Sequence, residues 1–245
     1  MAGAAVKARA HFEAGRLDDA IEVLGAELRS DPTDVRRRTF LFELLCFAGQ
    51  YDRAEKQLEV VAGASPEAGL GAWLYRSALH AERTRQEMFD AGATPGDGDA
   101  PASPVEGSLN GNAFGTLVDA DERVGPRLEL FAAGQYTWIP LEHIQSIHME
   151  PPTQLRDLLW APARVQTAPT FQGLELGEVL IPVLAPGSWR SDDDEVRLGR
   201  VTDWHELTDG RPVPIGQKLL LVDDEPFPIL ELRTLEISPA SRTVG

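Results

Sequence analysis

The chain has 245 residues, 42% of them hydrophobic and 25% charged, a composition typical of a folded protein with one large domain or two small ones. Its formal net charge of -16 argues against nucleic acid or an anionic membrane as the main partner, because both bind basic surfaces. No apolar run approaches the roughly 20 residues that span a bilayer, and the first residues lack the pattern of a signal peptide, so we expect a cytoplasmic protein.

Residues 1–90 are predicted to be helical. Apolar or small side chains recur at helical spacing near the N-terminus, namely at Val6, Ala10, Leu17, Ile21, Leu24 and Leu28. The segment Ser30–Asp34 is predicted to end one helix and cap the next. Further helices are expected at Val35–Ala48, at Asp52–Ala62 and from Ala68 to about Asp90.

Two stretches of this helical region match each other at an offset of 34 residues. The matching pairs are Ala14 and Ala48, Gly15 and Gly49, Asp18 and Asp52, Ala20 and Ala54, Leu24 and Leu58, and Pro32 and Pro66. Glycine permits a tight turn between paired helices, and proline ends the second helix. This period is typical of tetratricopeptide repeats, so residues 1–90 are predicted to form a tetratricopeptide-like helical module. An unrelated helical bundle is the alternative.

Residues 91–113 are rich in Gly, Pro and Asp and are predicted to be a flexible linker. Residues 114–240 are predicted to form an acidic β-rich domain. Its candidate strands are Gly115–Ala120, Arg127–Phe131, Tyr136–Ile139, His143–Met149, Trp160–Thr167, Glu178–Val183, Glu195–Thr202, Gln217–Val222 and Ile229–Ile237. A short helical turn is expected at Thr153–Leu159. The closely spaced strands predict a mainly antiparallel β domain, so the expected fold class is α+β.

The acidity is concentrated in the second part of the chain. Residues 91–245 hold 24 of the 39 acidic residues but only 11 of the 23 lysines and arginines. A basic or uncharged partner surface would suit this part of the molecule best.

No catalytic, metal or cofactor site is expected. The five histidines do not have the spacing of zinc ligands, and the acidic run Asp192–Glu195 lacks the ligand pattern of a calcium loop, so we interpret it as a solvated loop. Cys46 lies in an apolar run and is expected to be a buried, unreactive thiol. A hydrolase with an unrecognised pair of carboxylates stays open as an alternative, because acidic residues are abundant.

The helical module is expected to offer a partner-binding groove on the first helix of each repeat. Its predicted lining residues are Arg9, Phe12, Arg36, Thr39, Glu43 and Phe47. Trp189, in a loop of the second domain, is predicted to be exposed and to bind a partner as well. Trp160 is predicted to be buried, and Arg164 is expected to pair with an acidic group such as Asp157 or Asp203.

Five segments of the chain carry a family resemblance. They are Gly134–Ile147, Glu150–Pro152, Leu155–Arg164, Ile181–Ser188 and Val196–Trp204. With the helical N-terminus, they resemble the ImpE family, also called SciE or TagJ, of bacterial type VI secretion. The resemblance implies a non-enzymatic cytoplasmic adaptor that binds the small sheath subunit TssB near its N-terminal helix and influences how the ClpV unfoldase recycles contracted sheath. A generic repeat scaffold for another protein is the alternative.

Overall fold

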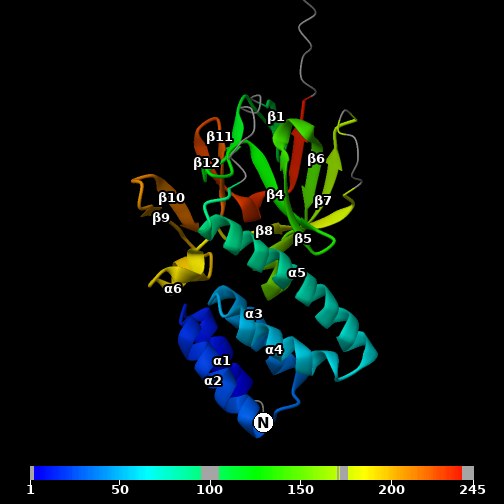
Figure 1. Cartoon of the computed structure of the whole chain (residues 1–245), viewed down its shortest axis with the longest axis vertical. Helices are drawn as coiled ribbons and strands as arrows, with labels where there is room; N and C mark the ends of the chain where they lie inside the picture. The colour runs from blue at the N-terminus through cyan, green and yellow to red at the C-terminus, as the bar shows by residue number, and fades with distance from the viewer. Residues whose placement is uncertain (1–2, 95–104, 170, 172–175, 239–245) are drawn as a thin grey trace, which may run out of the picture.

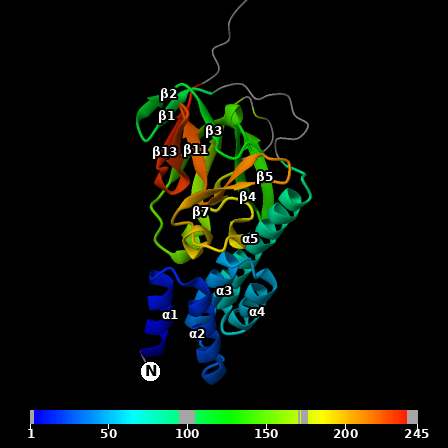
Figure 2. The ribbon, with the colours of Figure 1, turned by 90° about the vertical axis from the view of Figure 1, so that its left-hand side faces the viewer.

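The computed structural model describes residues 3–94, 105–169, 171 and 176–238, with side chains from residue 7 onward. Helices precede strands along the chain, and Figures 1 and 2 show the helices packed beneath one end of the β domain. The long helices are α1 (Gly3–Glu13), α2 (Leu17–Ser30), α3 (Val35–Phe47), α4 (Tyr51–Ala62) and α5 (Pro66–Asp90). In the described part of the chain, no helix combines the length and apolar character needed to cross a membrane.

Local signals in the sequence set the boundaries of these helices. Gly15 and Gly49 have φ values of +70° and +66°, in the left-handed region that favours glycine, and each joins the two helices of one repeat. The Asp34 carboxylate accepts the backbone N–H of Arg37 at 2.9 Å and caps α3. Pro66 occupies the first turn of α5, where a proline is tolerated. The predicted helical repeat is therefore confirmed in its turns as well as in its helices.

The second part of the chain is an antiparallel β domain, which confirms the predicted α+β class. Its strands are β1 (Gly107–Leu109), β2 (Asn112–Phe114), β3 (Leu117–Asp119), β4 (Arg127–Ala132), β5 (Gln135–Pro140), β6 (Ile144–Met149), β7 (Trp160–Thr167), β8 (Glu178–Pro182), β9 (Thr202–Glu206), β10 (Pro212–Gly216), β11 (Leu219–Val222), β12 (Glu225–Pro228) and β13 (Thr234–Ile237). The large sheet has the order β2-β1-β13-β6-β7-β8-β4-β5, and smaller sheets join β12-β11-β3 and β10-β9.

Short helical segments connect some of the strands. They are η1 (Leu141–His143), η2 (Leu155–Leu158), η3 (Ser188–Arg190), α6 (Asp194–Arg197) and η4 (Ile229–Glu231). The turn η2 lies within the predicted helical turn at Thr153–Leu159, which is thereby confirmed.

One hydrophobic core is shared between the helices and the β domain. Phe131, Leu159, Trp160 and Leu198 of the β domain pack in the same buried cluster as the apolar residues of α2 to α5. Trp160 is 3% exposed, as predicted, and its indole N–H donates to the Glu82 carboxylate at 3.1 Å. The two parts of the chain therefore fold against each other rather than as separate modules.

A buried group of charged residues reinforces this contact. The Arg85 guanidinium on α5 donates to both carboxylate oxygens of Glu129 on β4, at 2.7 and 3.0 Å. Lys218 also contacts Glu129, and its Nζ lies 2.6 Å from the Asp119 carboxylate. All four residues are buried. The positive charges of Arg85 and Lys218 hold the pKa of Glu129 well below its ordinary value, although burial alone would raise it.

The structure differs from the predicted linker in its second half. Residues 95–104 lie outside the described residues, but Gly107–Leu109 and Asn112–Phe114 form the hairpin β1–β2, and β1 pairs with β13. The Leu109 side chain is buried in the β-domain core, which explains why this glycine-rich segment is ordered.

The predicted strand Glu195–Thr202 is wrong, because its first residues belong to the short helix α6. The Asp193 carboxylate accepts the backbone N–H of Glu195 at 2.9 Å and caps this helix. The strand begins only at Thr202, and β9 and β10 form a hairpin that the sequence analysis did not identify.

We predict that Trp160→Ala lowers the free energy of unfolding by about 3–5 kcal/mol, because it removes the largest apolar side chain at the contact between helices and sheet. Trp204→Ala is the matched control, since Trp204 is 51% exposed and its loss should change stability by less than about 0.5 kcal/mol. Urea denaturation followed by circular dichroism measures both variants. Equal midpoints for the two variants would contradict the shared core.

We predict that Arg85→Met costs about 3–5 kcal/mol, because it leaves the Glu129 carboxylate buried without its main partner. Arg83→Met removes the same charge from the same helix. Arg83 pairs at the surface with Asp52 and Glu55, so its loss should cost no more than about 1 kcal/mol. Guanidinium or urea unfolding of both variants measures the difference, and a similar cost for both would show that the buried pair has no special role.

Candidate functional site

An open groove lies between the helices and the β domain. Its cavity volume is about 870 Å³. The lining residues come from α1, α2, α3 and the segment around η2, and they are Arg9, Phe12, Leu24, Val35, Arg36, Arg37, Thr39, Phe40, Glu43, Pro152, Thr153, Gln154, Leu155 and Leu158. The helical module therefore supplies one wall, and the β domain supplies the other.

Five of the seven predicted partner-binding residues meet in this groove. They are Arg9, Phe12, Arg36, Thr39 and Glu43. Phe47 does not line it, because its side chain is 0% exposed and packs in the core at the C-terminal end of α3.

Trp189 lies away from the groove and is half-buried rather than exposed. Its ring packs against the α3–α4 turn, where a Cβ added to Gly49 would lie 2.4 Å from a ring carbon. The Arg190 guanidinium covers the ring at 4.5 Å from its centroid. Trp189 therefore helps to join the β domain to the second repeat.

The wall from the β domain was missed in the sequence because its residues are far from the helices along the chain. The Asp157 carboxylate accepts the backbone N–H groups of Thr153 and Gln154, each at 2.8 Å, and this fixes the turn into η2. Leu155 and Leu158 then project toward the groove and pack against the helical core. The sequence indicated a helical turn at Thr153–Leu159, but it did not indicate that this turn lies next to the helices.

Two aromatic side chains give the groove an apolar surface. The rings of Phe12 and Phe40 meet edge to face, with their centroids 6.0 Å apart. Arg200 holds the end of α1, donating to the Phe12 carbonyl oxygen at 2.5 Å and placing its guanidinium 5.2 Å from the Phe12 ring centroid. Both aromatic rings are only partly buried, so they are available to another chain.

The charges in the groove are mainly positive. Arg37 is neutralised by Glu27 and Asp34, at 3.2 and 2.9 Å, and Arg9 makes an exposed pair with Glu13. Arg36 is exposed and makes no ion pair with any residue that the structure describes. Arginines therefore make up three of the four charged lining residues, and Arg36 supplies the positive charge that no ion pair offsets, on a protein with a net charge of -16.

Glu43 is the acidic residue of the lining and is 8% exposed. Burial raises its pKa to about 7, against the opposing effects of the Tyr75 hydroxyl and the Arg156 guanidinium. Tyr75 donates to the Glu43 carboxylate at 3.4 Å and accepts a bond from Arg156 at 3.1 Å. Near neutral pH this carboxyl group is therefore partly protonated and offsets only part of the positive charge.

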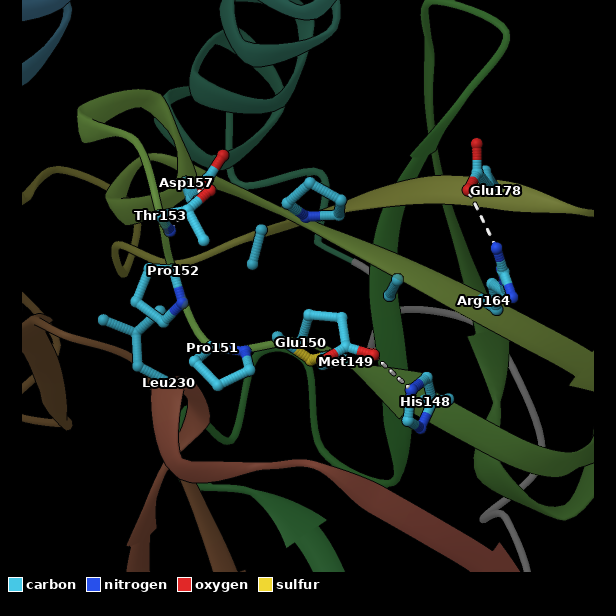
Figure 3. A pocket seen from close by; sticks show the side chains of 13 residues that line it. His148, Met149, Glu150, Pro151, Pro152, Thr153, Asp157, Arg164, Glu178 and Leu230 are labelled. Carbon is cyan, nitrogen blue, oxygen red and sulfur yellow. Dashed lines mark hydrogen bonds and ion pairs between the residues drawn. The ribbon is translucent and has the colours of Figure 1, made fainter.

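Figure 3 shows a second, smaller hollow of about 200 Å³, which shares Pro152 and Thr153 with the lining of the groove. Two ion pairs form among the lining residues of this hollow. His148 contacts Glu150 at 2.9 Å, and Arg164 contacts Glu178 at 3.6 Å.

The prediction that Arg164 pairs with an acidic group is therefore confirmed, but its partner is Glu178 and neither Asp157 nor Asp203. Arg164 on β7 lies directly opposite Glu178 on β8, and cross-strand neighbours on one face are close enough to pair. Asp157 is already occupied by the backbone of its own turn.

The acidic run Asp192–Glu195 is solvated in its first half, where Asp192 and Asp193 are exposed, but its second half lies at a contact between the two parts of the chain. The Asp194 carboxylate accepts the backbone N–H of Leu17 at 2.8 Å, at the start of α2. Glu195 pairs with Arg200 at 2.9 Å. Within the described ranges, no cluster of three or more His, Cys, Asp or Glu side chains could hold a metal ion. Cys46 is buried, and burial raises the pKa of its thiol.

Comparisons with known proteins agree with this architecture. Residues 111–236 match the family described as ImpE protein, and residues 11–72 match the tetratricopeptide repeat. The chain is 33% identical to the type VI secretion system accessory component TagJ of Pseudomonas aeruginosa, in an alignment that covers 93% of this chain and 90% of the relative. A crystal structure of a Vibrio parahaemolyticus protein shares the fold, with a TM-score of 0.82, 24% identity, and coverage of 95% of this chain and 97% of the other.

We predict that the Glu43→Gln variant becomes more stable than the parent protein as pH rises. Between pH 4.5 and about 7 the folded state holds a proton at Glu43 that the unfolded chain has lost, so this group costs stability as pH rises through that window. The variant and the parent should have similar stability at pH 5. At pH 8 the variant should be more stable by up to about 3 kcal/mol. Urea melts at both pH values test this, with the exposed Glu59→Gln as a control for loss of charge. A difference between Glu43→Gln and the parent that does not change with pH would contradict the prediction.

Proposed function

The chain belongs to the ImpE family, and we propose that it is an accessory adaptor of a type VI secretion system, acting in the cytoplasm without catalysis. The coarse role rests on its similarity to the TagJ accessory component over nearly the whole chain. The finer proposal is that its groove holds the N-terminal helix of the small sheath subunit TssB.

The geometry of the groove is the observation that supports this binding mode. An amphipathic helix binds to a protein groove through apolar side chains at i, i+3, i+4 and i+7, with its polar face toward solvent. Phe12 and Phe40 on one wall and Leu155 and Leu158 on the other offer the apolar surface that such a helix needs. The exposed Arg36 lies at the edge and would contact the polar flank of the helix.

The same geometry suggests what the partner helix looks like. Arg9 and Arg36 contribute positive charge, and the nearby Glu43 is partly neutral at physiological pH. Unlike charges across an interface favour association and correct orientation. We therefore expect an acidic side chain, or the negative C-terminal end of the helix, next to Arg36.

The effect on sheath recycling follows from occupancy of that helix. An adaptor that holds the N-terminal helix of TssB changes how accessible the helix is to the ClpV unfoldase. Binding energy at the groove therefore sets how strongly the adaptor modulates recycling, because only a bound helix is affected.

We predict that Phe12→Ala combined with Arg36→Glu weakens binding of the TssB N-terminal helix at least about tenfold, which corresponds to about 1.4 kcal/mol. The first change removes apolar contact, and the second places a like charge opposite an acidic flank. Fluorescence anisotropy with a labelled peptide of that helix, taken from the same secretion system, measures the affinity.

Arg53→Glu is the control, because it makes the same charge change on the exposed surface of α4, outside the groove. Its affinity should equal that of the parent. Phe12 also contacts Arg200, so the melting temperature of the double variant must show that it is folded. Unchanged affinity in a folded double variant would exclude the groove. Capture of another protein in place of TssB from the native cell would favour the generic scaffold.

A further inference from the structure

The outer face of the first half of α5 carries an exposed apolar stripe. Leu70, Trp73 and Leu74 are 64%, 60% and 57% exposed, respectively. Their spacing of i, i+3 and i+4 places them on one side of the helix. We call these three residues the α5 stripe. An exposed tryptophan flanked by leucines is typical of the centre of a protein interface rather than of free surface.

The position of the stripe in the repeat explains why it is uncovered. In a tetratricopeptide array each helix is covered by the next one, and the final repeat normally has a polar outer face. Here the chain leaves the repeats after α5. The second half of that helix buries Glu82, Arg85 and Phe89 against the β domain. Figure 1 shows the first half extending past β5.

The β domain contacts α5 at Tyr75, whose hydroxyl accepts from Arg156 at 3.1 Å, and at Ser77. The turn at Gly134 approaches Ser77 closely, since a Cβ added to Gly134 would lie 3.1 Å from the Ser77 Cβ. A Cβ added to Gly71, six residues earlier in the helix, would have no other described segment within 4 Å. The stripe is therefore open, and the backbone beside it leaves room for another helix to approach.

We propose that the α5 stripe binds the same stripe of a second copy of this chain, with the two helices antiparallel about a two-fold axis. If the two-fold axis passes next to residue 72, Leu70 of each copy lies opposite Leu74 of the other copy. The two Trp73 side chains then lie next to each other at the axis. Such an isologous contact is closed, so it gives a dimer and no larger assembly.

The charges along the helix favour this antiparallel arrangement. Glu67 lies at the N-terminal end of the stripe, and Arg76 and His80 lie toward its C-terminal end, all three on the surface. An antiparallel pair brings the acidic end of each helix to the basic end of the other, whereas a parallel pair would bring like charges together. Among the residues that the structure describes, the one ion-pair contact of Arg76 is a long, exposed one of 3.9 Å with Glu55, which leaves room for a second partner at its guanidinium.

The experiment is sedimentation velocity on the full chain alone, without any sheath component. Across about 1–100 μM protein, the weight-average mass should rise from that of one chain of 26.8 kDa toward twice that value. A tryptophan at the centre of an interface usually dominates its affinity, so Trp73→Glu should weaken dimerisation at least about thirtyfold. Trp204→Glu, the same change at another exposed tryptophan, should leave the dimer intact.

A charge exchange tests the orientation. Glu67→Arg and Arg76→Glu should each weaken the dimer, and the double variant should regain it, because the unlike pairs are restored in reverse. A parent chain that stays monomeric throughout this range, or a folded Trp73→Glu variant that still dimerises, would overturn the proposal. No recovery in the double variant would overturn the antiparallel arrangement. The groove residues are untouched in all these variants, so binding of the TssB helix should be unchanged whatever the outcome.

Discussion

The carboxylate of Glu129 is the group on which the arrangement of this molecule depends. It is buried on β4 and accepts bonds from Arg85 on α5, from Lys218 and, at 2.8 Å, from the Tyr136 hydroxyl. Transfer of a carboxylate into a protein interior costs several kcal/mol, and two positive charges with directed hydrogen bonds offset that cost here. The ion pair between Arg85 and Glu129 therefore fixes the position of α5 on the sheet. If α5 were displaced, Arg85 on the helix and Glu129 on β4 would each lose its partner.

This constraint explains how a two-walled groove can exist. Fixing α5 on the sheet also positions α4, which packs against it, and α3, whose Phe42 ring lies 5.0 Å from the Tyr75 ring on α5. The contact between Tyr75 on α5 and Arg156 on η2 acts in the same direction, with the guanidinium 5.3 Å from the ring centroid. The repeats alone are too few to form a deep concave surface, so the β domain supplies the second wall.

The parts of the structure that could be predicted from the sequence are those set by neighbouring residues. Gly15 and Gly49 specify their turns locally, and the 34-residue offset between them predicts paired helices. The hairpin β1–β2 could not be predicted, because Leu109 is ordered by Leu235 of β13, at the other end of the chain. Phe47 was wrongly predicted to line the groove, again because its surroundings depend on residues that are distant in the sequence. From Leu41 to Phe47 every residue of α3 is buried, since other helices and the β domain surround it, and helical spacing cannot reveal that.

The net charge of the whole chain also differs from the charge of the groove residues. A net charge of -16 suggests a basic partner, yet the groove presents Arg9 and Arg36 around a carboxyl group, Glu43, whose pKa is near neutrality. At physiological ionic strength electrostatic effects decay over about 8 Å, so a helix in the groove responds to these few residues more than to the distant acidic sheet. The overall charge governs the approach of a partner and its dependence on salt. The local charge decides which segment of that partner fits, so the two can differ in sign without conflict.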